Sequence, residues 1–219
     1  MSFDPLAESR GTFAGSGSDA MWLELLASGL TFDLTSLAPG EAAEAPACRH
    51  LFGLPDEVRH QRFEAVTLSP GPHLAGGEAL VPVIRCLAWL AARLAALPGA
   101  QAVAWHPARC WSAPQPFRAG VQRWIEGGAF PGLSLAPLME GPDGALQSEG
   151  LALFVGQELR IEPELAEDPA EGAKLALRLL HWLVESGPLR AMERLVGPNG
   201  EPLKLQPSAN GRFVRVWKG

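Results

Sequence analysis

Leu80-Val-Pro-Val-Ile-Arg-Cys-Leu-Ala-Trp-Leu-Ala-Ala-Arg-Leu-Ala-Ala-Leu97 is the most apolar stretch of the chain. It is followed by Pro98-Gly99 and then by Gln101-Ala-Val-Ala-Trp-His106. This order predicts a buried helix over 80–97, a tight turn and a central strand over 101–106. We expect the other elements to be arranged around this helix and strand.

Three side chains decide what kind of helix 80–97 is. Pro82 is tolerated because it falls in the first turn, where its missing N–H has no partner to lose. Arg85 and Arg93 lie in the interior of the stretch, and charges at such positions are costly in lipid. The stretch therefore predicts a soluble core helix and excludes a membrane-spanning one.

A second helix is expected over Pro169–Ser186. Asp168 is suited to the N-cap, Pro169 to the first helical position and Glu171 to the capping box. Gly187-Pro188 ends the pattern. Leucines and a tryptophan share one face by helical spacing and charged residues the other, which is typical of a helix that packs on a sheet.

The C-terminal region contains the strongest hairpin signal in the chain. Asn199-Gly200 and Asn210-Gly211 separate three apolar-rich runs, and Asn-Gly is a favoured hairpin turn. These runs cover residues 189–196, 202–206 and 212–217. Alternation and β-branched residues predict further strands over 30–34, 64–68, 133–138, 150–155 and 158–161.

These elements predict an α+β fold: a mixed, partly antiparallel sheet that packs against the two main helices, 80–97 and 169–186, with C-terminal β-hairpins. No interior linker is long or polar enough to separate two cores, so we expect a single domain over 20–219. Residues 1–19 are rich in glycine and serine and offer little to bury. They are expected to form a flexible N-terminal arm.

Composition narrows the functional classes. The 219 residues carry a net charge of −6, with arginines scattered along the chain, which argues against nucleic acid as a partner. The three cysteines Cys48, Cys86 and Cys110 are odd in number and form no C-x-x-C pair, so a reducing compartment is expected. The N-terminus has no signal-peptide pattern. We interpret the protein as cytoplasmic and independent of membranes.

The segment from Ser148 to Glu162 reads Ser-Glu-Gly-Leu-Ala-Leu-Phe-Val-Gly-Gln-Glu-Leu-Arg-Ile-Glu. Together with the helix and hairpins that follow, it resembles the C-terminal region of an uncharacterised bacterial domain family. That family has a Thr-x-Gly-Leu start, a Phe-Gly pair and a Glu-Leu strand. Here Ser148 replaces the threonine, and Val155 separates Phe154 from Gly156. The resemblance implies an α+β sheet fold and a bacterial source, and it implies no activity.

His106, Arg109 and Cys110 form the first candidate site. Polar groups at the end of a central strand lie where open α/β sheets usually place ligands. Arg109 would bind an anion, His106 would act as an acid or base, and Cys110 would serve as a nucleophile if its thiolate were stabilised. The alternative is a histidine bonded to backbone beside a cysteine that packs as a small hydrophobe.

Glu149 and Glu158 form the second candidate site. Two carboxylates near one sheet edge can perform general acid–base work when one raises the pKa of the other. The alternative is a solvated loop acid and a surface strand acid. Trp111, in a proline-rich loop, is the tryptophan that we expect to be most exposed.

We expect neither cofactor nor metal. The chain has no phosphate-binding loop, no dinucleotide fingerprint and no Gly-x-Ser-x-Gly nucleophile elbow. Cys48, His50 and His60 have a C-x-H-x9-H spacing, which matches no zinc pattern.

Two functional hypotheses follow. The first is a non-enzymatic bacterial accessory or interaction protein that binds a protein partner, or a second copy of itself, through a sheet edge or an apolar helix face. The alternative is a small-molecule-binding protein or enzyme whose pocket lies where the strand closes at His106. Its ligand is unknown, and it requires His106, Arg109 and a carboxylate to converge.

Overall fold

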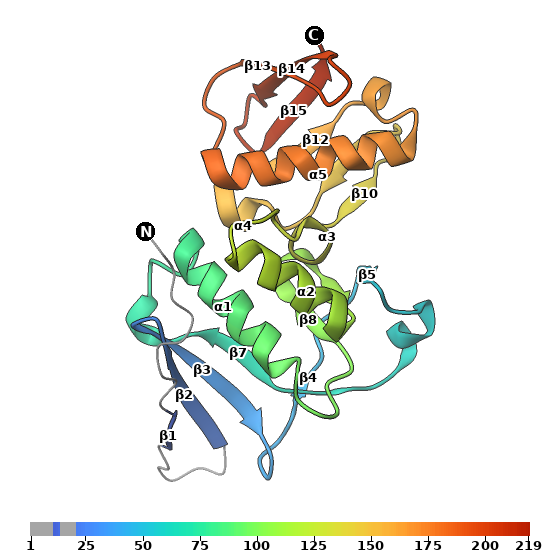
Figure 1. Ribbon diagram of the computed structural model, residues 1–219. Coiled ribbons are helices and arrows are strands. Elements are labelled where there is room, and N and C mark those ends of the chain that lie inside the picture. The colour runs from blue at the N-terminus through green and yellow to red at the C-terminus, as the bar shows by residue number, and fades with distance from the viewer. Residues whose placement is uncertain (1–10, 14–20) are drawn as a thin grey trace.

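The computed structural model describes residues 11–13 and 21–219 and confirms the α+β class (Figure 1). The five α-helices of these residues are α1 (Val81–Leu94), α2 (Pro114–Ile125), α3 (Gly132–Leu135), α4 (Ala152–Val155) and α5 (Pro169–Ser186). The strands of the described residues form four sheets, and the two long helices α1 and α5 pack on different ones.

The N-terminal part is an antiparallel sheet in the order β1-β2-β3-β7, with α1 on one face (Figure 1). Its strands are β1 (Gly11–Phe13), β2 (Met21–Ala27), β3 (Leu30–Leu37) and β7 (Thr67–Pro70). Alternation turns Phe32 of β3 toward the helix, where it packs with Val83, Cys86 and Leu90. A separate pair, β4 (Ala43–Glu44) and β6 (Glu64–Ala65), follows on the connecting segments.

The middle of the molecule holds α1, α2 and a small sheet in the order β5-β9-β8. Its strands are β5 (His50–Phe52), β9 (Cys110–Ser112) and β8 (Val103–Trp105). β5 runs parallel to β9, and β8 runs antiparallel to it. Phe117, Val121 and Trp124 of α2 are fully buried or nearly so. The two helices and the sheet thus share one core.

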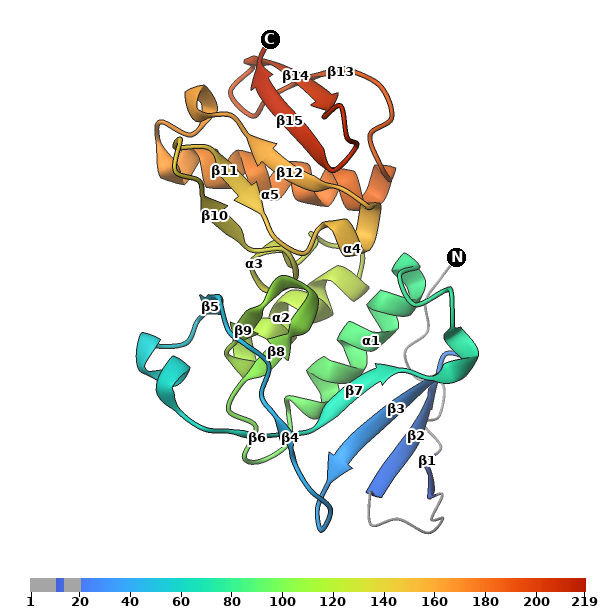
Figure 2. The same cartoon turned by 180° about the vertical axis from the view of Figure 1, so that it is seen from behind.

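The C-terminal part is a six-stranded sheet in the order β10-β11-β12-β15-β14-β13. Its strands are β10 (Leu138–Glu140), β11 (Leu146–Ser148), β12 (Glu158–Ile161), β13 (Glu193–Val196), β14 (Pro202–Pro207) and β15 (Phe213–Lys218). Only β12 and β15 are parallel neighbours. α5 lies across one face of this sheet, and no α-helix of the described residues covers the opposite face (Figure 2).

One continuous cluster of buried side chains joins the middle and C-terminal parts, and the partly buried Leu87 and Trp89 of α1 pack against both this cluster and a smaller one between α1 and the N-terminal sheet. The single domain over 20–219 stays a prediction. Most of the expected arm, 1–19, lies outside the described residues. Its described portion, Gly11–Phe13, is strand β1, because the edge of β2 offers backbone partners to residues 11–13.

The long elements agree with the sequence predictions. α5 has the predicted bounds, with Asp168 accepting hydrogen bonds from the N–H groups of Ala170 and Glu171. α1 ends at Leu94, and hydrogen bonds between residues three apart continue the helical turn to Leu97. The predicted hairpin runs are β13, β14 and β15.

The strand predicted after α1 is present as β8, but its predicted central position is wrong, because β9 occupies the middle of its sheet. Two other strand predictions were wrong. In place of the strand predicted over 133–138, residues 132–135 form α3. Within 150–155, residues 152–155 form α4, which Gly156 ends in the left-handed conformation at φ +73°.

Candidate functional site

Three basic side chains converge on the Glu149 carboxylate, which directly follows β11. His50 Nε2 lies 2.6 Å from Glu149 Oε2, and Arg109 donates from Nε to Oε1 at 2.5 Å. Arg109 Nη2 pairs with the same oxygen, and Arg49 Nη1 lies 3.5 Å from Oε2. The structure therefore brings together two predicted site residues, Arg109 and Glu149.

Local backbone geometry sets this convergence. β5 and β9 are in register at His50 and Cys110, and the N–H groups of Arg49 and His50 both donate to Arg109 O, at 2.8 and 3.0 Å. Arg109 itself has a left-handed backbone, φ 47° and ψ 37°. The two arginines, each of which directly precedes one of these paired strands, are consequently neighbours.

Gly150 allows Glu149 to reach this pair. It has φ +105°, and a Cβ at this position would lie 2.7 Å from Ala108 Cβ and 2.8 Å from Leu135 O. Only glycine combines that conformation with so close an approach. The residue after Glu149 thus packs directly against the turn that carries Arg109.

The carboxylate is covered, whereas the guanidinium groups reach solvent. The Glu149 side chain is 16% exposed, compared with 44% for Arg49 and 49% for Arg109. Burial raises the pKa of Glu149, but hydrogen bonds from His50 and Arg109 and the charge of Arg109 outweigh it, so the pKa lies below its ordinary value. The cluster therefore combines one ionised acid with two half-exposed cations.

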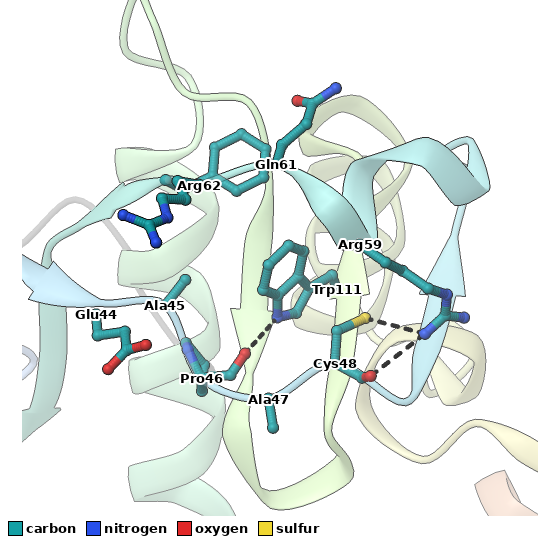
Figure 3. A pocket seen from close by; sticks show the side chains of 10 residues that line it. Glu44, Ala45, Pro46, Ala47, Cys48, Arg59, Gln61, Arg62 and Trp111 are labelled. Atoms are coloured by element: carbon teal, nitrogen blue, oxygen red, sulfur yellow. Dashed lines mark hydrogen bonds between the residues drawn. The ribbon is translucent and has the colours of Figure 1, made fainter.

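A hollow of about 510 Å³ is lined in part by Cys48, the residue that directly precedes Arg49 of the cluster (Figure 3). The side chains around it are Glu44, Ala45, Pro46, Ala47, Cys48, Arg59, Gln61, Arg62, Phe63 and Trp111. Arg59 joins the hollow to the cluster, since it lines the hollow and donates to Cys48 O at 3.3 Å and Arg49 O at 3.0 Å.

Trp111 and Phe63 supply the aromatic part of this lining and meet edge to face, with ring centroids 5.6 Å apart. The expectation that Trp111 is exposed was wrong, because the side chain belongs to β9 and is 6% exposed. Its Nε1–H donates to Pro46 O at 3.1 Å (Figure 3). That hydrogen bond holds the segment before β5 against the ring.

The two cysteines of this region are thiols at neutral pH. Burial raises the pKa of Cys110 to about 11, and its Sγ contacts Ser112 Oγ and Leu133 O. Burial also raises the pKa of Cys48, and the charge of Arg59 opposes this only in part. Because the thiolate is the nucleophile, Cys110 does not have the environment that its proposed role requires.

Glu158 has a separate role at the start of α4. Its carboxylate accepts hydrogen bonds from the N–H groups of Gly150, Leu151 and Ala152, at 2.9, 3.2 and 3.1 Å, and from Ser148 Oγ at 2.5 Å. These bonds satisfy the unpaired N–H groups at the start of a helix. The structure thus places Glu149 and Glu158 in different hydrogen-bond networks and forms no acid–base pair from them.

His106 does not join the cluster. It begins the turn before Arg109 and is exposed, and in the part of the chain that the structure describes its side chain makes no hydrogen bond. The expectation that His106 and Arg109 converge with a carboxylate is therefore met by Arg109 alone.

Sequence reasoning missed Arg49 as a site residue and considered His50 only as a metal ligand. β5 is three residues long, so periodicity gave no reason to place either residue on a strand beside Arg109. Within residues 11–13 and 21–219, no group of three or more histidine, cysteine, aspartate or glutamate side chains is placed to hold a metal ion.

Comparison of the chain with protein-family models, curated proteins and solved structures gave no match. The likeness to an uncharacterised bacterial family therefore stays a prediction, as does the cytoplasmic location. None of the helices in the described ranges has the length and apolar character needed to cross a membrane.

Proposed function

We propose that this protein is a non-enzymatic binding protein for a small organic anion. The Arg49–Arg109 pair binds a phosphate or carboxylate group, and the hollow beside it receives the flat apolar remainder of the ligand. The observation that carries the proposal is the pair of half-exposed guanidinium groups held on one covered carboxylate.

Electrostatics support the anionic class of ligand. Glu149 offsets only one of the two guanidinium charges that contact it, so the pair keeps a net positive charge in a chain whose total is −6. A guanidinium carries five N–H donors in a fixed plane that matches phosphate and carboxylate oxygens. Because Glu149 orients Arg109 through two of its nitrogens, binding requires little further ordering of that side chain.

The hollow supports the apolar part of the ligand. Its volume of about 510 Å³ lies within the range of roughly 300–1,000 Å³ common for small-molecule sites. Cys48, which directly precedes Arg49, lines the hollow, and so does Arg59, which donates to Arg49 O at 3.0 Å. One small molecule can therefore contact both an arginine and the aromatic lining.

Side-chain chemistry supports binding over catalysis. The raised pKa values of Cys48 and Cys110 disfavour a thiolate nucleophile. Glu149 is engaged in ion pairs, and Glu158 is engaged with the N–H groups at α4. These groups have structural partners where a catalytic role would need a free acid or base.

Isothermal titration calorimetry with three probes tests the proposal: phenyl phosphate, benzoate and inorganic phosphate. We expect phenyl phosphate or benzoate to bind more tightly than inorganic phosphate, since only they have a ring for the hollow. The better of the two aromatic probes identifies the anionic group. Arg109→Ala is expected to weaken its binding by about tenfold, equivalent to about 1.4 kcal/mol.

Arg212→Ala is the matched control, because Arg212 is an exposed arginine next to β15 in the C-terminal sheet. It should leave the affinity unchanged. The proposal is wrong if none of the three probes binds at millimolar concentration, or if Arg109→Ala and Arg212→Ala bind the probes equally well.

A further inference from the structure

A second surface with binding character lies at the opposite edge of the C-terminal sheet. β13 is an outer strand of that sheet, and in the described residues its only strand neighbour is β14. Val196, its last residue, is 76% exposed, and Met192, just before it, is 49% exposed. An open edge with exposed apolar side chains is a template for pairing with another strand.

The backbone of β13 offers donors and acceptors at this edge. Gly197 donates to Glu201 O at 2.7 Å, and hydrogen bonding alternates along an antiparallel pair. Leu195 therefore directs its N–H and C=O toward β14, whereas Arg194 and Val196 direct theirs outward. An added strand would bond to these two residues.

A groove of about 430 Å³ runs between β13 and α5. Its lining residues are Leu175, Arg178, Leu179, Trp182, Leu195, Val196, Gly197, Pro198 and Leu203. Arg178 is the single charged side chain of this lining. It is exposed, and no carboxylate in the described ranges pairs with it.

We propose that β13 and this groove bind an extended segment of a partner protein in which an apolar side chain adjoins an aspartate or glutamate. The segment adds to the sheet at Arg194 and Val196, its apolar side chain enters the groove, and its acidic side chain meets Arg178. Strand addition supplies affinity through main-chain bonds, and the groove supplies specificity. This interaction is independent of anion binding at Arg109.

A second copy of the chain fits this edge less well. A symmetric antiparallel pair centred on Arg194 would set two arginines opposite each other, and like charges in directly opposed positions are unfavourable. Centring the pair on Leu195 would set Arg194 against Val196 of the second copy, which leaves the charge unmatched.

Selection from a displayed library of random 12-residue peptides on the full chain tests the proposal. We expect enriched peptides to combine an apolar residue with an adjacent aspartate or glutamate. Arg194→Pro removes an outward N–H without breaking the β13–β14 pairing, so it should abolish binding of those peptides. Arg178→Glu should weaken binding about tenfold by reversing the charge at the rim.

Glu140→Pro is the matched control, placed on β10 at the other edge of the same sheet. Its N–H also points outward, because Gly141 bonds to Ala145 O on the neighbouring segment, and it should leave peptide binding intact. Unchanged circular dichroism and melting temperature would show that each variant folds. The proposal is overturned if no peptide is enriched, if enriched peptides bind Arg194→Pro as well as they bind the parent, or if sedimentation shows a dimer that Arg194→Pro dissociates.

Discussion

Arg109 occupies a left-handed backbone conformation that glycine adopts more readily, and its side chain contacts Glu149 through two of its nitrogens. For an L-residue this conformation costs roughly 1–2 kcal/mol. Backbone strain of this kind is found at binding and switch sites when the surroundings hold the residue in place. Arg109 is held by its ion pair with Glu149 and by the hydrogen bonds that its carbonyl oxygen accepts from the N–H groups of Arg49 and His50.

Two substitutions at Arg109 separate the backbone from the ion pair. Arg109→Ala and Arg109→Gly both lose the contact with Glu149, but only glycine relieves the left-handed backbone. We expect the glycine variant to be more stable than the alanine variant by about 1 kcal/mol in urea denaturation. Equal stabilities would mean that the backbone at this position carries no strain.

Glu149 makes the free energy of unfolding depend on pH in the acidic range. We expect Glu149→Gln to lower the free energy of unfolding at neutral pH by about 1–3 kcal/mol, because hydrogen bonds to charged partners are lost. The folded-state pKa of Glu149 is lowered, so its contribution is fully present above the unfolded pKa of about 4.3 and is lost as the pH falls through the folded value. The difference between the parent and Glu149→Gln should therefore shrink below about pH 4.3.

Urea denaturation over a series of pH values measures this difference. Glu185→Gln is the control, since Glu185 is exposed on α5 and its removal should shift stability little at any pH. A difference between the parent and Glu149→Gln that stays constant to low pH would contradict the assigned ion pairs.

At the residue scale, Arg109 and Glu149 were predicted as site residues from the sequence, but the contact between their side chains was not. The two residues are 40 positions apart, and His50 is 99 positions from Glu149. Their contact depends on the parallel pairing of two three-residue strands and on the approach of Gly150 to Ala108. Neither leaves a periodic pattern in the chain.

At the scale of elements, α1 stabilises the end of α2 through Arg85. Arg85 Nη2 donates to Trp124 O at 2.9 Å and to Ile125 O at 3.3 Å, and its guanidinium lies 5.0 Å from the centroid of the Trp124 ring. The last carbonyl groups of a helix have no partner within the helix, and a cation is favoured there. The interior arginine of an otherwise apolar helix is thus used as a cap.

Replacing Arg85 tests this cap. Arg85→Met keeps an apolar side chain of similar length but removes the donors, so we expect thermal or urea unfolding to show a loss of about 1–3 kcal/mol. Arg93→Met on the same helix is the control, because Arg93 is exposed. If both variants lost the same small amount, Arg85 would not act as a cap.

Long elements were predictable from the sequence because their periodic patterns and end signals agree. The Asp168 cap and the Gly187 stop define α5, and the two Asn-Gly turns separate the last three strands. α3 and α4 are four residues each, which is too short for a helical period to be distinguished from alternation. The start of α4 also depends on hydrogen bonds to the Glu158 carboxylate, which no local sequence pattern predicts.

At the scale of the whole molecule, the cluster around Glu149 lies where the middle sheet meets the C-terminal part. Arg49, His50 and Arg109 come from the β5–β9 region, whereas Glu149 comes from the end of β11. The α+β class was predictable from the order of elements. The division of strands into four sheets was not, because it depends on long-range pairing such as the parallel contact of β12 with β15.

The central claim is that Arg49 and Arg109 bind an anion beside the Trp111 hollow, and nuclear magnetic resonance of the ¹⁵N-labelled full chain tests it most directly. On titration with phenyl phosphate, the arginine Nε–H signals of Arg49 and Arg109 and the indole N–H signal of Trp111 should shift together, while that of Arg212 should not move. Assignment by Arg109→Ala would confirm the identity of the signal. The claim is contradicted if the Arg49, Arg109 and Trp111 signals stay in place, or if every exposed arginine shifts to the same extent.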